Sequence, residues 1–418
     1  MPLAGDPPVH PYRWALIIGL VLCSTALVWY GFTIGVLLPD ISDDLGLRPA
    51  QEGWLSSSFY LGQLVLTLPV TAWLSRYPPL RTMALVYALT VVLLIVAAIT
   101  PWFWGQVGIR FALAFSFVAL NPVRTLIIAG WFRRSEVARV NGLFNGGFGL
   151  VQTIAFWSSG FLLSVLGGWR AVVWLLVALG AIAAVAWFFL MQHAPPPSTP
   201  PEPASSAQGG SMGRVLRRRE VWFLCMIGIG GALTWSAYLT FWPSFAQDRL
   251  GLTDAATGVV LGCSALMIIP GSLAASWVVQ RVGSRRLFLV VATLSQIPCF
   301  ALWVLLDNTV ALVVVGIFQG LSWIYFPIML SVPFDIKGFN PRDIALATGM
   351  FFVANALALT LGPSVSGLLA EWVDMRTVLL GVALMPLVSV AGALLLPDPP
   401  SFVLPDAVDP DRALAPAS

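Results

Sequence analysis

The chain has 418 residues, of which 58% are apolar and only 10% charged, and its mean hydropathy is +0.87. A soluble domain cannot bury so large an apolar fraction, so the composition excludes a soluble globular protein and predicts a polytopic membrane protein. The net charge is +3, and the basic residues are scattered along the edges of apolar runs, which excludes a nucleic-acid-binding protein.

Twelve apolar runs of about 20 residues or more follow one another along the chain, and each is long enough to cross a bilayer core of about 30 Å. The first run is too long for a cleaved signal peptide. We therefore predict an all-α membrane protein with twelve transmembrane helices, at residues 14–38, 54–75, 82–101, 103–131, 137–165, 169–191, 221–245, 256–279, 286–306, 309–333, 343–370 and 376–396.

The distribution of basic residues between the connecting loops predicts the orientation. An even number of spans places both termini on one side of the membrane. The loops, linker and tails of that side hold sixteen Lys and Arg, whereas the opposite loops hold only Arg48, Arg170, Arg249 and Arg376. The positive-inside rule therefore predicts that both termini are cytoplasmic and that the protein lies in the cell (inner) membrane.

The composition between the spans predicts four parts of the chain. Residues 1–193 and 221–396 each form a six-helix bundle. Residues 194–220 form a linker that is rich in Pro, Ser and Ala and ends in a basic segment, which we expect to lie against anionic lipid headgroups. Residues 397–418, with their alternating Pro and Asp, form a disordered cytoplasmic tail.

The two predicted bundles repeat each other at a nearly constant offset of 205 to 208 residues. The paired positions are Gly46 and Gly251, Gly53 and Gly258, Gly108 and Gly316, Gly142 and Gly349, Thr153 and Thr360, and Gly160 and Gly367. Two six-helix halves related in this way imply a solute site between them, near the middle of the membrane.

Several short motifs resemble those of the major facilitator superfamily, over essentially the whole chain. The loop from Arg76 to Arg81 and its copy, Gln280-Arg281 to Arg285-Arg286, resemble the family's Gly-x-x-x-Asp-Arg-x-Gly-x-Arg-Arg signature. Arg110 stands where the fourth helix of the family carries its membrane arginine. The segment 333–349 is similar to the corresponding part of cyanate and nitrate/nitrite permeases.

The resemblance implies a gate at the signature loops. The gating residues that it implies are Arg76, Arg81, Gln280, Arg281, Arg285 and Arg286. This chain lacks the acidic residue of the signature in both copies, which leaves hydrogen bonds and packing to hold the gate closed. The alternative is that these arginines only enforce the topology.

The acidic residues indicate the sign of the solute. None of the nineteen Asp and Glu lies deep in an apolar run, and both His residues, His10 and His193, lie outside the runs. A carrier of cations needs a buried anion, and proton relays are usually built from carboxylates or histidines. The only charged groups deep in the predicted spans are Arg110 and Arg124, so we expect a small anion.

Arg110 and Arg124 are 14 residues apart, which on a helix is about 21 Å of rise and about 40° short of four turns. They therefore share a face of the helix, and each presents a fork of donors that suits two oxygens of one anion. The alternatives are that Arg110 binds backbone carbonyls and that Arg124 extends to the inner headgroups. Arg124 has no basic counterpart in the repeat, which favours it as a solute contact.

In the family that the chain resembles, helices one, four, seven and ten line the cavity. The aromatic and amide side chains that we expect to line it with the two arginines are Tyr30, Asn121, Asn145, Trp235, Tyr238, Gln319, Trp323 and Tyr325. Each has an alternative role in membrane packing, in the interfacial belt or in hydrogen bonds between helices.

We predict a monomeric transporter that moves a small organic or inorganic anion by alternating access, with membrane lipids as its other partners. No catalytic constellation and no metal-ligand spacing is present, and the four Cys lie in apolar runs, so we expect no enzyme and no cofactor. One alternative is an exporter of neutral amphipathic compounds. The other is a receptor or assembly factor of the same fold that transports nothing.

Overall fold

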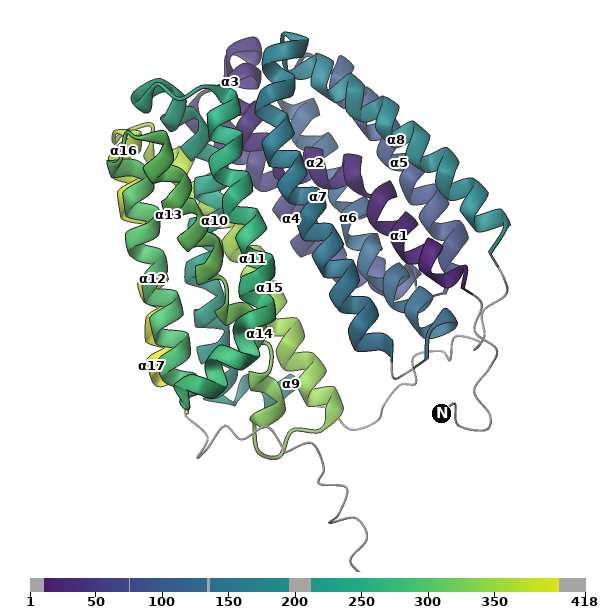
Figure 1. Ribbon diagram of the computed structural model, residues 1–418, viewed down its shortest axis with the longest axis vertical. Coiled ribbons are helices and arrows are strands. Elements are labelled where there is room, and N and C mark those ends of the chain that lie inside the picture. Colours follow the sequence, from purple (N-terminus) through teal and green to yellow (C-terminus); the bar gives the residue numbers. More distant parts are fainter. Residues whose placement is uncertain (1–10, 75, 134–135, 195–211, 398–418) are drawn as a thin grey trace, which may run out of the picture.

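The structure is a computed structural model that describes residues 11–74, 76–133, 136–194 and 212–397. Throughout these ranges the regular elements are helices (Figure 1), which confirms the all-α prediction. Most of the predicted linker and almost all of the predicted tail lie outside the described residues, so those two predictions stay open.

The first half of the chain supplies eight described helices, drawn purple to teal in Figure 1. Their bounds are α1 Arg13–Cys23, α2 Thr25–Phe32, α3 Ile34–Leu45, α4 Pro49–Leu74, α5 Pro79–Ile99, α6 Phe103–Trp131, α7 Val137–Leu166 and α8 Trp169–Gln192. We call residues 13–192 the N-terminal half. Within it, α6 packs along α4 and α5, and α8 packs along α5.

The second half, residues 219–395, is drawn teal to yellow and is preceded by the short helix α9 (Met212–Leu216). Its elements are α10 Arg219–Leu250, α11 Asp254–Val282, α12 Arg285–Leu305, α13 Thr309–Ser322, α14 Tyr325–Met329, the 3-10 turn η2 Val332–Asp335, α15 Pro341–Leu369, α16 Met375–Val382 and α17 Pro386–Leu395. We call this the C-terminal half. Here α10 packs along α15 and α17.

Three of the predicted spans are interrupted. The first consists of α1, α2 and α3, the tenth of α13, α14 and η2, and the twelfth of α16 and α17. The hydroxyl of Ser24 donates to the Leu20 carbonyl at 2.6 Å and that of Thr33 to the Trp29 carbonyl at 2.8 Å, and such bonds compete with the helix ladder. Pro386 begins α17 because it has no N–H to continue α16.

Among the described residues, eleven segments are long and apolar enough to cross a membrane. The 26-residue α4 is long enough but more polar, because it contains the run Ser56, Ser57 and Ser58 as well as Gln63. The count of twelve spans and the orientation of the termini therefore stay predictions.

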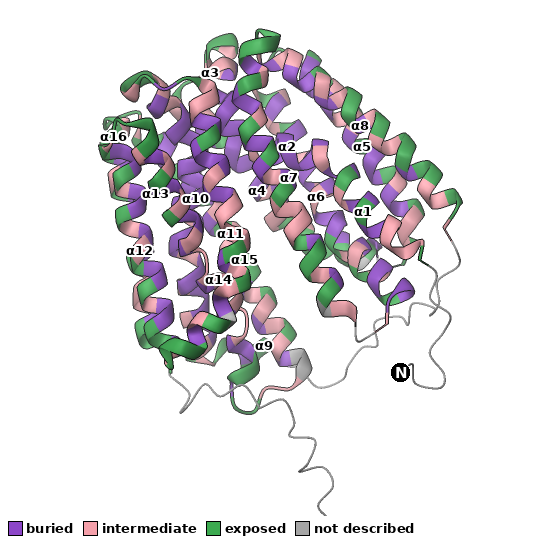
Figure 2. Ribbon diagram, in the orientation of Figure 1, coloured by how far each residue is buried: buried purple, intermediate pink, exposed green. Residues whose placement is uncertain are grey.

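Apolar side chains cover the outside of both halves. Leu68, Leu85 and Leu273 are more than 70% exposed, and exposed residues follow the outward faces of the helices (Figure 2). Such a surface would aggregate in water but suits contact with lipid chains. This distribution agrees with a multi-pass integral membrane protein.

The two halves meet at one end of the molecule, which carries the α3–α4, α7–α8, α10–α11 and α15–α16 connections and is at the top of Figure 1. We call it the outer end, after the predicted topology, and the opposite end the inner end. At the outer end α4 lies along α15 and α7 lies along α11. The Ser57 hydroxyl, on α4, donates to the Thr360 carbonyl, on α15, at 2.7 Å.

Glycines allow the backbones of the two halves to touch at the outer end. A Cβ at Gly53 would lie 2.3 Å from the Pro363 carbonyl oxygen, and one at Gly258 would lie 2.5 Å from that of Phe156. These two glycines are partners in the sequence repeat, so the two contacts are symmetric.

A second symmetric pair of contacts lies nearer the outer surface. A Cβ at Gly160 would lie 2.0 Å from the Asp254 carbonyl oxygen, and one at Gly367 would lie 2.3 Å from that of Pro49. Only a residue without a side chain permits backbones to come this close. We call Gly53, Gly160, Gly258 and Gly367 the outer glycines.

The helices diverge toward the inner end. On α7, a Cβ at Gly149 would still lie 3.1 Å from the Ile269 side chain of α11, but Gly146 and Gly142, further inward, have nothing within 4 Å. On α15, Gly349 likewise has nothing within 4 Å. The halves are therefore closed at the outer end and apart at the inner end (Figure 1).

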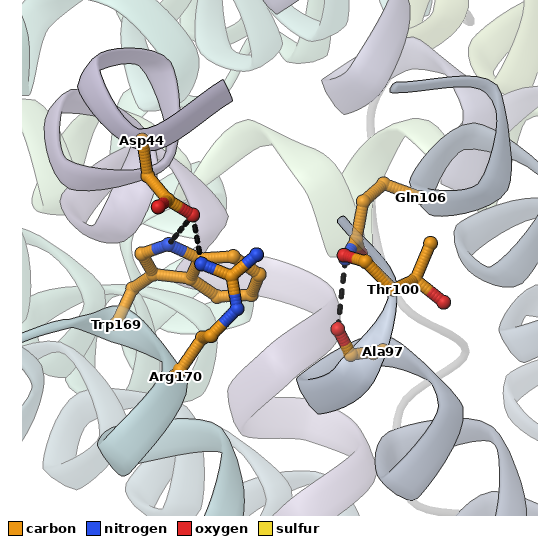
Figure 3. A network of polar contacts seen from close by, with 6 residues as sticks. All are labelled: Asp44, Ala97, Thr100, Gln106, Trp169 and Arg170. Carbon is orange, nitrogen blue, oxygen red and sulfur yellow. Dashed lines mark hydrogen bonds and ion pairs between the residues drawn. The ribbon is translucent and has the colours of Figure 1, made fainter. Parts of the chain in front are cut away.

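Polar contacts tie the outer ends of the N-terminal helices to one another (Figure 3). Asp44, near the end of α3, accepts a hydrogen bond from the Trp169 indole at 3.1 Å and forms an ion pair with Arg170, both at the start of α8. The Gln106 side chain donates to the Ala97 carbonyl at 2.8 Å and so ties α6 to α5. These contacts fix the outer end as a rigid rim.

Candidate functional site

Arg110 lies on α6 and is completely buried inside the N-terminal half. Its guanidinium donates to the carbonyls of Leu55 at 2.9 Å, Tyr30 at 3.0 Å and Gly31 at 3.3 Å. The last two carbonyls lie just before the interruption at Thr33. Arg110 thus joins α4 to the interrupted first span, and in this conformation its guanidinium binds backbone carbonyls.

Tyr30 and Tyr238, which are 208 residues apart, lie in the cores of their own halves. The Tyr30 hydroxyl donates to Gln106 Oε1 at 3.3 Å, and the Tyr238 hydroxyl lies 3.0 Å from the carbonyls of both Phe300 and Leu379. Both side chains are at most 1% exposed. The structure places them apart from Arg124, in the packing of each bundle.

Arg124 has different surroundings from Arg110. It is half-buried, and its Nη1 donates to Asn145 Oδ1 of α7 at 3.1 Å, while its Cζ lies 4.6 Å from the ring centroid of Phe144. Its Nε is buried without a hydrogen-bond partner among the described residues. The structure therefore brings the two predicted site residues Arg124 and Asn145 together, and the Nε–H donor of Arg124 has no described acceptor.

The position of Asn145 places this pair at the border of the two halves. Gly149, four residues further along α7, faces Ile269 of the C-terminal half. Residues four apart lie on the same face of a helix, so Asn145 faces the space between the halves one turn inward of that contact. Asn121 is exposed on α6, one turn before Arg124, and α6 continues through Pro122 without a break.

Phenylalanines line the N-terminal half next to Arg124. Phe144 stacks on Phe148, and Phe148 lies within 6.5 Å of both Phe117 and Phe32, measured between ring centroids. A cation beside aromatic faces is stabilised without being neutralised. The guanidinium of Arg124 is therefore a positive charge at the edge of an apolar wall.

The remaining predicted cavity residues gather in the C-terminal half. Trp235 of α10 meets Trp323 edge to face at 5.8 Å, and Trp323, in the interruption between α13 and α14, stacks on Tyr325 at 5.8 Å. Gln319 is fully buried at the end of α13 and accepts a hydrogen bond from the Ser264 hydroxyl of α11. The structure thus brings Trp235, Trp323 and Tyr325 into contact, and Gln319 precedes Trp323 by four residues at the end of α13.

The sequence analysis missed Gln296 of α12, which faces this group and is fully buried. A Cβ at Gly231 would lie 2.6 Å from the Tyr325 hydroxyl oxygen and 3.0 Å from Gln296 Oε1, so the two side chains meet there. A glutamine inside an apolar run was a visible signal. It was not predicted because helices one, four, seven and ten line the cavity in the family that the chain resembles, and Gln296 lies on the ninth predicted span.

The predicted gate residues lie at the inner end, and the described contacts of Arg285 and Arg281 stay within the C-terminal half. Arg285 forms an ion pair with Asp335 of η2, and Arg281 lies over the Trp277 ring at 4.0 Å. Arg286 donates to the Leu394 carbonyl. Arg76, Arg81 and Gln280 are exposed. Their role in gating stays a prediction.

A cavity of about 640 Å³ lies between α11, α12 and α13. Its walls are almost entirely apolar, with residues such as Val278, Val291 and Phe318, and the last two are exposed on the outside of the bundle. Hydrocarbon fits this groove better than a polar solute. No group of His, Cys, Asp or Glu suited to a metal occurs among the described residues.

Comparisons with known proteins agree on one family. A sequence model of the Major Facilitator Superfamily matches residues 18–338. The chain is 24% identical to the hexuronate transporter of Bacillus subtilis (81% of this chain, 83% of the relative) and 29% identical to the chloramphenicol resistance protein of Streptomyces lividans (69% and 72%). It is 23% identical to sugar efflux transporter C of Escherichia coli (79% and 83%).

Solved structures share the fold at low sequence identity. A bacterial homologue of the human lysosomal transporter Spinster, in an inward-facing and unoccupied conformation, matches with a TM-score of 0.79 at 16% identity, over 93% of this chain and 98% of that one. The nucleoside transporter NupG matches with a TM-score of 0.72 at 19% identity, over 93% and 99%. The likeness to cyanate and nitrate/nitrite permeases stays a prediction.

Proposed function

This chain belongs to the Major Facilitator Superfamily and is a membrane transporter rather than an enzyme, and from this premise we propose that it moves a small anion by alternating access. Arg124 is the residue that we propose to bind the anion. The proposal extends to Asn145 and Asn121 as its neutral neighbours, and to an inward-facing state as the conformation of this structure.

A single observation carries the proposal. Arg124 has one described hydrogen bond, to a neutral amide, and its Nε is buried without a partner. It lies seven residues, or about 10 Å along the helix, from the inner end of α6. A positive charge at such a depth is unfavourable unless an anion or water meets it. Because it borders the space between the halves, a solute anion is the natural partner.

One relative favours an anionic solute. The Bacillus subtilis relative is a hexuronate transporter, and a hexuronate is a sugar that carries a carboxylate. A guanidinium binds the two oxygens of a carboxylate through parallel hydrogen bonds. The proposal therefore covers organic monocarboxylates as well as small inorganic anions.

A second candidate is the export of neutral amphipathic compounds. The relative from Streptomyces lividans is a chloramphenicol resistance protein, and the phenylalanines beside Arg124 offer an apolar wall. In that case Arg124 would serve only to hold α6 against Asn145. The two candidates differ in whether the charge of Arg124 is needed.

We propose uniport or anion exchange as the mode of coupling. The acidic residues nearest to the spans, such as Asp40, Glu52 and Asp335, lie near helix ends. A proton relay through the membrane needs carboxylates or histidines in its interior. A proton that travels on a weak-acid solute needs neither.

The test is a flux measurement on purified protein in liposomes with a radiolabelled monocarboxylate. Arg124→Gln keeps N–H donors on a shorter side chain but removes the charge, and we expect at least a hundredfold loss of uptake, since losing a charged hydrogen-bond partner costs about 3 kcal/mol. Arg124→Lys, which keeps the charge without the fork, should retain part of the activity.

The control is the flux of a neutral amphiphile, radiolabelled chloramphenicol, in the same liposomes, with its binding measured by thermal shift. If Arg124→Gln transports as well as the wild type, the anion proposal is wrong, and the exporter takes its place if chloramphenicol is carried. If the wild type carries neither solute, the protein is a receptor or assembly factor with this fold.

A further inference from the structure

We infer that the C-terminal half carries a neutral subsite, made of Gln296, Gln319 and Trp323 with the rings of Trp235 and Tyr325, that binds the ring and hydroxyl groups of the solute. This inference rests on the proposed function of Arg124 and narrows it. Arg124 holds the carboxylate and the subsite holds the rest, so the solute is a hydroxylated cyclic carboxylic acid.

Gln319 provides the first free donor of the subsite. It is fully buried, and its Oε1 accepts a hydrogen bond from the Ser264 hydroxyl. In this orientation of the amide, the nitrogen points away from Ser264. Its Nε2 has no hydrogen-bond partner among the described residues, so its two N–H groups are available.

Trp323 provides the second donor and the aromatic wall. Its indole Nε1 is buried without a described partner, while the side chain as a whole stays partly exposed. It follows Gln319 by four residues, directly after the end of α13, about one helical turn along the chain. Trp235 and Tyr325 contact its ring and hold it in place.

Gln296 completes the group from α12. It is fully buried, and its amide faces the Tyr325 hydroxyl, which is its polar neighbour inside the cluster. Gly231 faces both Gln296 and the Tyr325 hydroxyl, and any side chain there would occupy the space between them. Buried polar groups are normally satisfied, so the unpaired Nε2 of Gln319 and Nε1 of Trp323 in one cluster point to a ligand.

Trp235, one member of the subsite, borders the same space as Arg124, from the opposite half. A Cβ at Gly35 would lie 1.7 Å from the Leu239 carbonyl oxygen, so α3 and α10 touch at that level. Trp235 precedes Leu239 by one turn on the same face of α10. It therefore lies one turn inward of a contact between the halves, as Asn145 does on α7.

The chemistry of this cluster suits a hydroxylated ring. Its members offer N–H donors, amide oxygens and indole and phenol faces, and none of them is charged. Hydroxyl groups both donate to and accept from amides, and the apolar face of a ring packs on an indole. A small inorganic anion would leave all of these groups unused.

The experiment is isothermal titration of the full chain in detergent with four probes: glucuronate, cyclohexanecarboxylate, glucose and nitrate. Glucuronate carries both the charge and the hydroxyls, and each of the other probes lacks at least one of them. We expect glucuronate to bind at least about tenfold more tightly than each of the other three, because a site built for hydroxyl groups rejects analogues that lack them.

Two variants remove donors with little change in shape. In Gln319→Leu and in Trp323→Phe we expect the affinity for glucuronate to fall about tenfold, and that for cyclohexanecarboxylate to stay within about twofold. Trp323→Phe keeps an aromatic ring and leaves the Ser264 contact intact, so it remains informative if Gln319→Leu folds poorly. Val313→Leu, also on α13 but outside the cluster, is the matched control.

The outcomes separate this inference from the proposed function. Suppose that glucuronate and cyclohexanecarboxylate bind with equal affinity, that Arg124→Gln lowers the affinity for both, and that Trp323→Phe lowers it for neither. The subsite is then overturned, while the anion site stands. If glucose binds as tightly as glucuronate and Arg124→Gln changes neither, the anion site is overturned, and the solute is a neutral sugar.

Discussion

The two ends of the molecule are held in different ways. At the outer end the backbones of the halves touch through the outer glycines, and Arg110 donates to three carbonyls. At the inner end the halves are apart, and Arg124 has a single described hydrogen bond. The outer end is therefore closed by close backbone packing, whereas at the inner end Arg124 carries a charge that the described residues do not neutralise.

The ion pairs sharpen this difference. Those that the structure describes each join groups of one half, such as Arg13 with Glu136 or Arg285 with Asp335, or join α9 to the C-terminal half, as Arg214 does with Asp343. None of the described pairs spans the two halves. Charges thus stiffen each half, while close backbone packing holds the halves together at the outer end.

The largest effect is expected from filling the outer contacts. In Gly160→Ala and Gly367→Ala the new Cβ would meet a backbone carbonyl at 2.0 and 2.3 Å, so the outer end cannot close as it does in this structure. Overpacking costs about 1–3 kcal/mol, which shifts the balance of the two states about 5- to 150-fold. Spin-label distances across the outer end should lengthen, and transport should fall accordingly.

The same helices offer matched controls. Gly142 on α7 and Gly349 on α15 are repeat partners like Gly160 and Gly367, but a Cβ at either has nothing within 4 Å. Gly142→Ala and Gly349→Ala should leave the distances unchanged and stabilise the helices slightly. Equal effects of all four substitutions on transport would contradict the role of the outer glycines.

The second prediction separates the two arginines of α6. Arg110→Met removes the donor that the Tyr30 and Gly31 carbonyls bind, at a cost of about 1–3 kcal/mol for each, whereas the Leu55 carbonyl keeps the Ser58 hydroxyl at 2.7 Å. It should lower the melting temperature of the solute-free protein clearly, whereas Arg124→Gln should leave it nearly unchanged. If Arg110→Met melts like the wild type and loses only solute affinity, Arg110 belongs to the solute site, as the sequence predicted.

Much of the fold follows from the sequence, because apolar runs and repeated glycines are local signals. The spacing of Gly53, Gly160, Gly258 and Gly367 revealed the repeat, but only the structure shows that each glycine meets a carbonyl of the other half. The interruptions at Thr33 and Trp323 were missed, since a single hydroxyl or aromatic residue inside an apolar run does not predict a break.

The candidate site was predictable in part for the same reason. A charge in a span is rare, so Arg110 and Arg124 were both found. The two arginines differ in their hydrogen-bond partners. Arg110 binds backbone carbonyls beside an interrupted helix, and Arg124 binds a neutral amide. Such neighbours come from other helices, and no pattern within α6 encodes them.

The smallest effect is expected at the inner end of the N-terminal half. Arg13 donates two hydrogen bonds to Glu136, at 2.6 and 2.8 Å, and the backbone N–H of Arg133 donates a third at 3.1 Å. Partial burial opposes its ionisation, but these bonds outweigh it and hold the pKa of Glu136 below its ordinary value of about 4.5.

A depressed carboxyl pKa stabilises the folded state above the ordinary pKa, and the benefit is lost as the pH falls through the lowered value. Below about pH 4.5 the wild type should therefore lose a small stabilisation, about 1 kcal/mol or less for a pair at the surface. Glu136→Gln lacks this stabilisation at every pH. Thermal melts from pH 7 to pH 3 measure this. Because the pair lies within one half, Glu136→Gln should not change the spin-label distance across the inner end. A change in that distance would mean that charges, and not the outer glycines alone, determine how far the halves open.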